Sequence, residues 1–79
     1  MNKVTKRPLD LDIYDQYGID QRYSAFKINI LDITIDEVDQ FEYDYISQGY
    51  KLFNSELERV PNKNSFSLTL IVAKLSYTF

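Results

Sequence analysis

Residues 24–49 read SAFKINILDITIDEVDQFEYDYISQG, and this stretch decides the fold. Its first part alternates the apolar residues Phe26, Ile28 and Ile30 with the polar residues Lys27 and Asn29. Successive side chains of a strand point to opposite faces, so this alternation is typical of a strand with one buried face. The sequence therefore predicts a strand over residues 24–33.

A helix start follows this strand directly. Thr34 and Glu37 have the spacing of a capping box, in which a hydroxyl and a carboxylate bind free amides of the first turn. We expect the helix to run from Ile35 to about Gln48. Gly49 then supplies the left-handed residue at which many helices end.

The expected helix has one apolar side. At 100° per residue, five residues fall within an arc of roughly 140° and should face the sheet: Ile35, Val38, Phe41, Tyr45 and Ile46. Asp36 and Asp44 should face solvent, with Tyr43 at the boundary. Glu42 lies inside the apolar arc, where an unpaired charge would be costly.

Three explanations are open for this carboxylate. It could form an ion pair with Lys27, Lys51 or Arg59. It could be exposed because the helix is slightly rotated. The remaining alternative is a functional carboxylate.

Two further strands are expected after Gly49. Residues 50–60 have strand character with polar residues on both faces, which suits a bent or edge strand. Residues 61–64, PNKN, form a turn by composition, because proline presets one dihedral angle and asparagine tolerates a positive φ. The closing strand, residues 65–79, changes the phase of its apolar residues near Val72 and Ala73. This change predicts a bulge there, with burial on both faces as the alternative.

The N-terminal part is less regular. Residues 9–14, LDLDIY, alternate leucine or isoleucine with aspartate, which predicts a strand with an acidic outer face and a turn near Tyr17 and Gly18. An ordered arm is the alternative. Residues 1–8 are expected to be a flexible basic arm.

The whole chain, residues 1–79, should form a single domain of the α+β class. We expect a small antiparallel sheet of three to four strands with one helix packed across one face. The preferred order of elements is β, β, α, β, β.

A short motif resembles a known group of proteins. Gly49, Tyr50, Lys51, Leu52 and Phe53 follow the helix, and the last strand ends in an aromatic residue. This arrangement is similar to a family of small uncharacterised bacterial domains of β-α-β-β order, which carry Gly-Trp-Glu-Leu-Val after their helix. The resemblance covers about residues 24–79, with tyrosine in place of the tryptophan and lysine in place of the acid. It implies a fold and no catalytic residues.

The composition lacks the usual residues of catalysis. The chain has no histidine and no cysteine, which removes the common general base, the thiol nucleophile and the common transition-metal ligands. Two glycines are too few for a phosphate-binding loop, and the acids at positions 10, 12, 15 and 20 do not follow the EF-hand pattern. We therefore expect no enzyme, no cofactor and no metal site.

Charge is unevenly distributed along the chain, whose formal net charge is −3. Residues 1–7 carry three bases and no acid, whereas residues 8–49 carry ten acids and two bases. The acidic middle should repel nucleic acid, so binding through Lys3, Lys6 and Arg7 is not favoured. No apolar run approaches the roughly 20 residues of a membrane span. With no cysteine, the expected compartment is the cytoplasm.

Tyrosines interleaved with acids favour a protein-binding module, a regulator or inhibitor from a bacterium or its phage. Tyrosine is a frequent interface anchor, and an acidic surface suits a basic partner, including a nucleic-acid enzyme whose groove the carboxylates would fill in place of phosphates. The predicted binding residues are Asp12, Tyr14, Tyr17, Asp36, Tyr43 and Asp44.

The alternative function is structural self-association. The C-terminal segment LIVAKLSYTF is more apolar than so small a core can cover. An uncovered strand edge pairs readily, so this strand could form a homodimer across a two-fold axis.

Overall fold

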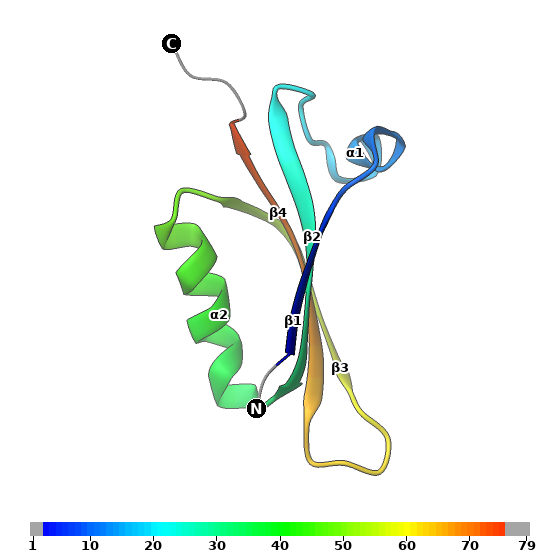
Figure 1. The fold of residues 1–79 in the computed structure, drawn as a ribbon, viewed down its shortest axis with the longest axis vertical. Helices are drawn as coiled ribbons and strands as arrows, with labels where there is room; N and C mark the ends of the chain where they lie inside the picture. The colour runs from blue at the N-terminus through cyan, green and yellow to red at the C-terminus, as the bar shows by residue number, and fades with distance from the viewer. Residues whose placement is uncertain (1–2, 76–79) are drawn as a thin grey trace.

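The computed structural model describes residues 3–75, which form one sheet and two helices (Figure 1). In chain order the elements are β1 (Lys3–Pro8), α1 (Leu11–Tyr17), β2 (Tyr23–Ile33), α2 (Ile35–Ser47), β3 (Lys51–Arg59) and β4 (Phe66–Leu75). The antiparallel sheet has the strand order β1-β2-β4-β3, with α2 on one face and α1 on the other. The expected α+β class is confirmed, and α1 is an additional helix. Within the described residues, neither helix has the length and apolar character that a bilayer span requires.

The two central strands, β2 and β4, hold most of the core. Six side chains on the α2 face are fully buried: Ile28, Ile30, Ile33, Leu68, Leu70 and Val72. Val38, Phe41 and Tyr45 of α2 pack against them. Ile35 and Ile46, which were also expected to face the sheet, are 60% and 51% exposed. The helix is thus rotated relative to the arc that its apolar residues predict.

The ends of α2 agree with the sequence pattern. The backbone N–H of Thr34 donates to Oε1 of Glu37 at 2.9 Å, and the Thr34 hydroxyl lies 3.3 Å from the same oxygen. A capping box therefore starts the helix. After Ser47, Gly49 has φ 95°, a conformation that favours glycine, and its N–H donates to the carbonyl of Ile46.

β4 shows no bulge at Val72 and Ala73. Both residues pair with β2 without a register shift, whereas against β3 the register shifts between Val72 and Ile71, where Phe53 is the extra residue of β3. The extra residue therefore belongs to the partner strand and not to β4, and β4 is buried on both faces, which was the alternative. Ile71 and Ala73 are buried on the face that α1 covers. The irregularities lie in the neighbouring strands instead, between Ile30 and Ile33 in β2 and between Leu52 and Asn54 in β3.

The position of β4 leaves little of its described length free for the expected mode of self-association. β4 pairs with β2 along one side and, from Phe66 to Ala73, with β3 along the other, so this part of the strand has no free edge. Residues 76–79 of the predicted strand lie outside the described residues. Among the described residues, unpaired edges remain on β1, on β3 and at the last two residues of β4.

The predicted strand in LDLDIY is wrong, because its last four residues, 11–14, belong to the short helix α1, and Asp10 is the residue before the helix. Helical spacing places Tyr14 and Tyr17 toward the sheet, where Tyr14 and Ile19 cover Ala25 of β2. Leu11, which the alternating pattern would bury, is 61% exposed. Gly18 ends the helix with φ 68°.

The expected flexible basic arm is also wrong for the described residues. Lys3–Pro8 forms β1, which pairs with β2 over its whole length. Lys6 points to the α2 side, where its ammonium group lies over the ring of Phe26 and donates to the Tyr50 hydroxyl at 3.0 Å. Pairing and this aromatic contact together give the basic segment a fixed place in the sheet.

Candidate functional site

The structure divides the predicted binding residues between two faces. Asp36, Tyr43 and Asp44 are exposed on α2, whereas Asp12 is exposed on α1, on the other side of the sheet (Figure 1). A single binding surface requires the two groups to lie close together, and the fold places them on opposite sides of the sheet. One surface made of all these residues is therefore excluded.

Tyr14 and Tyr17, the two predicted binding tyrosines on α1, differ in burial. Tyr14 is buried, and Tyr17 is half-buried. Tyr14 is 6% exposed; its hydroxyl accepts a hydrogen bond from the Ala25 N–H at 2.9 Å and donates to the Tyr23 carbonyl at 3.2 Å. Tyr17 packs at the margin of the same cluster. Tyr14 is thus unable to anchor a partner, and the helical spacing of Tyr14 and Tyr17 is the signal that could have revealed this.

One side of α2 remains uncovered and forms a candidate interface. Ile35, Tyr43 and Ile46 are 60%, 64% and 51% exposed. At 100° per residue they share one arc of the helix with Asp39, next to the side that packs on the sheet. We call Ile35, Asp39, Tyr43 and Ile46 the α2 flank.

Glu42 has a different partner from those expected. The Ser55 hydroxyl of β3 donates to its Oε2 at 2.6 Å. Among residues 3–75, Glu42 forms no ion pair, and Lys27, one of the expected cations, lies on the opposite face of the sheet. This carboxylate is therefore accounted for by a hydrogen bond that joins α2 to β3.

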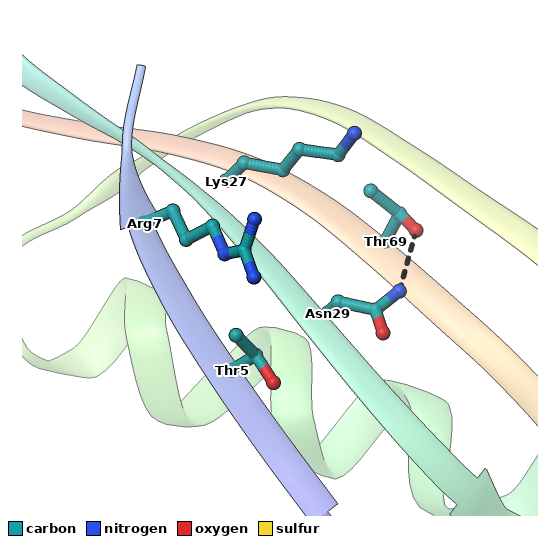
Figure 2. Close-up of a pocket in the computed structure, with 5 residues that line it drawn as sticks. All are labelled: Thr5, Arg7, Lys27, Asn29 and Thr69. Carbon is teal, nitrogen blue, oxygen red and sulfur yellow. Dashed lines mark hydrogen bonds between the residues drawn. The ribbon is translucent and has the colours of Figure 1, made fainter.

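A second candidate site lies on the sheet face that looks away from α2. Figure 2 shows Thr5 and Arg7 of β1, Lys27 and Asn29 of β2 and Thr69 of β4, with α2 behind the sheet. They line an open hollow of about 320 Å³. The strand register places them together, because Thr5 is opposite Asn29, Asn29 is opposite Thr69, and Arg7 is opposite Lys27.

The polar groups of this hollow are of two kinds. Asn29 Nδ2 donates to Thr69 Oγ1 at 3.1 Å, which fixes a neutral hydrogen-bonding row across two strands (Figure 2). Arg7 and Lys27 are cations on directly opposed positions, an arrangement that repels in the absence of an anion. Neither cation forms an ion pair or hydrogen bond with another residue of the range 3–75.

A neighbouring hollow of about 310 Å³ shares Lys27 and Thr69 with the first. Leu9, Ile13, Tyr17 and Ile71 supply an apolar wall to it, and Glu56 and Glu58 of β3 supply carboxylates. The charge on this sheet face therefore changes from basic on the β1 side to acidic on the β3 side.

The sequence pattern identified only part of this face. Alternation in β2 marks Lys27 and Asn29 as the polar side of a strand, yet it cannot show which residues of β1 and β4 lie beside them. Register across strands is a long-range property, so the cluster becomes visible only in the folded sheet. Among residues 3–75, no group of three acids is arranged as metal ligands would be.

Comparison of the chain with protein-family models, with curated proteins and with solved structures yields no match. The resemblance to the bacterial β-α-β-β domains consequently stays a prediction.

Proposed function

We propose that this protein is a small non-enzymatic protein-binding module that docks through the α2 flank. The observation that carries the proposal is the exposure of Ile35, Tyr43 and Ile46 on a helix whose other apolar side already packs on the sheet. Exposed apolar side chains gathered on one surface are typical of interaction sites. Tyr43 is the expected anchor, since tyrosine offers a large contact area.

The partner of this flank should be basic. The helix Ile35–Ser47 contains five acids and no lysine or arginine. Complementary charge around an apolar centre accelerates association and selects against acidic partners. A sharper form of the proposal makes the partner a nucleic-acid enzyme whose phosphate-binding groove receives these carboxylates. We also propose a cytoplasmic location, supported by the absence of cysteine.

The experiment compares binding by matched surface variants. Tyr43→Ala and Ile46→Ala remove exposed side chains of the α2 flank, while Leu11→Ala removes an equally exposed apolar side chain on α1, across the sheet. Proteins retained from a cell lysate by each immobilised variant are identified, and the affinity of the purified partner is then measured. We expect both α2 variants to lose a basic protein that Leu11→Ala retains.

Two results would overturn the proposal. In one, the same proteins are retained by all three variants while circular dichroism shows that each is folded. In the other, the partner lost with the α2 variants is acidic, or its binding is independent of salt. A competition experiment tests the sharper form, in which the partner is a nucleic-acid enzyme. In that form this protein should displace DNA from the partner, because the carboxylates occupy the groove that binds DNA.

A further inference from the structure

Arg7 and Lys27 form a pair of like charges that the described part of the protein does not neutralise. They occupy opposed positions of β1 and β2, where side-chain Cβ atoms lie about 5 Å apart. Charged side chains often protect sheet edges, and this explains a cation on the edge strand β1. It does not explain Lys27, which lies on the interior strand β2. The pair is better explained as the charge complement of an anion.

Hydrogen-bond donors surround the pair on the same face. The Thr69 hydroxyl accepts a bond from Asn29 and so keeps its own hydrogen available, and Thr5 lies in the same row on the other side of Asn29. An arginine fork, an ammonium group and two hydroxyls together suit a ligand with several acceptor oxygens and about two negative charges. A phosphate monoester has three such oxygens and a charge of about −1.5 to −2 at neutral pH.

The neighbouring hollow suggests the form of the rest of the ligand. It begins at Lys27 and Thr69 and continues between the apolar wall of Leu9, Ile13 and Tyr17 and the carboxylates of Glu56 and Glu58. A body with an apolar surface and a few donor groups fits between these walls. A long polyanion does not, because it would meet the two glutamates within the same face.

We propose that this sheet face binds the phosphate monoester of a small molecule. Arg7 and Lys27 bind the phosphate oxygens, Thr5 and Thr69 donate hydrogen bonds to them, and Asn29 holds Thr69 in place. The apolar wall contacts the organic part of the ligand. The site lies on the face opposite the α2 flank, so it is independent of the proposed protein docking.

The test uses the intact protein and phenyl phosphate as the probe. Titration followed by ¹H–¹⁵N spectra should give saturable shifts at the backbone amides of Thr5, Lys27, Asn29 and Thr69, with a dissociation constant of about 1 mM or lower. Inorganic phosphate should shift the same amides and bind more weakly, because it lacks the organic part. Lowering the pH below the second phosphate pKa, about 6, should weaken binding of phenyl phosphate.

Variants with altered charge then distinguish a specific binding site from general electrostatic attraction of the anion. Arg7→Ala and Lys27→Ala should each weaken binding about tenfold or more, the expected loss of a hydrogen bond to a charged group. Lys27→Arg should retain most of the affinity. The matched control is Arg59→Ala with Lys63→Ala, which removes two cations from the separate basic hollow at the turn after β3. It should leave the affinity unchanged.

Three results would overturn the proposal. The control variant could weaken the binding of phenyl phosphate as much as Arg7→Ala does, which would show a general effect of charge. The amide shifts could fail to saturate or could lie at the turn after β3. A single-stranded oligonucleotide could bind the same residues more tightly than phenyl phosphate, which would replace the small molecule by a nucleic-acid backbone. Arg7→Lys, which keeps the charge and removes the fork, serves if Arg7→Ala does not fold.

Discussion

The ammonium group of Lys6 lies 4.3 Å from the centre of the Phe26 ring. The same nitrogen donates a hydrogen bond to the hydroxyl of Tyr50, and Phe26 and Tyr50 meet edge to face with ring centres 6.4 Å apart. Tyr45 of α2 meets Tyr50 in the same way at 5.8 Å. A cation on the edge strand β1 thus joins the aromatic residues that connect the sheet to α2.

Replacement of Lys6 by glutamine should lower the free energy of unfolding by about 1 kcal/mol, because it removes a cation–π contact and the bond to Tyr50. Arg7→Gln is the control: it is the next residue of β1, on the other face, and it relieves repulsion with Lys27. Urea unfolding should show opposite signs for the two variants. Equal losses would mean that β1 is sensitive to any charge change.

The capping box should depend on both of its members. Thr34→Ala should cost about 1 kcal/mol, and Glu37→Ala a similar amount, because each removes part of one hydrogen-bonded turn. The double variant should cost less than the sum, since the two side chains stabilise the same turn. Additive losses in urea unfolding would contradict a shared cap.

Tyr14→Phe should destabilise the protein by about 1 to 3 kcal/mol, because it leaves the buried N–H of Ala25 without its acceptor. Tyr17→Phe is the matched control, since the Tyr17 hydroxyl has no hydrogen-bond partner in the range 3–75. The control should unfold at the wild-type midpoint. A loss of binding without loss of stability in Tyr14→Phe would restore its predicted role as an anchor.

Stability should fall in alkali partly through Tyr45. Burial, the largest cause, raises the pKa of its phenol above the ordinary value of 10.0; Lys6 opposes this rise, while Tyr50 and Asp44 add to it. A raised pKa contributes stability that is complete below the unfolded-state value and is lost as the pH rises through the folded-state value. Tyr45→Phe should therefore lose less stability than the wild type as the pH rises above the ordinary phenol pKa of 10.0.

The control for this measurement is Tyr43→Phe, because Tyr43 is 64% exposed on the same helix. Its unfolding midpoint should change with pH as that of the wild type does. If Tyr45→Phe and Tyr43→Phe show the same alkaline profile as the wild type, the loss comes from other groups.

The sequence by itself determined the elements whose signals are local. The strand Tyr23–Ile33 is predicted by the two-residue alternation of its apolar side chains. The helix α2 is predicted by the capping box at its start and by Gly49 just after its end. The turn at residues 61–64 follows in the same way, and Asn62 has the positive φ of 64° that asparagine tolerates. The helix cap and the turn depend on hydrogen bonds and dihedral angles of neighbouring residues, and the strand is marked by an alternation within its own residues, although its hydrogen bonds go to β1 and β4.

Tertiary structure decided the features that depend on distant partners. Most of LDLDIY belongs to a helix because its tyrosine packs on Ala25, although its alternation predicts a strand. Lys3–Pro8 is ordered because the edge of β2 offers free backbone N–H and C=O groups for pairing. β4 is apolar on both faces because α1 covers one face of the sheet and α2 covers the other. The row of Thr5, Asn29 and Thr69 exists only when three strands are in register, since pairing across a sheet is set by packing of the whole fold and by no single segment.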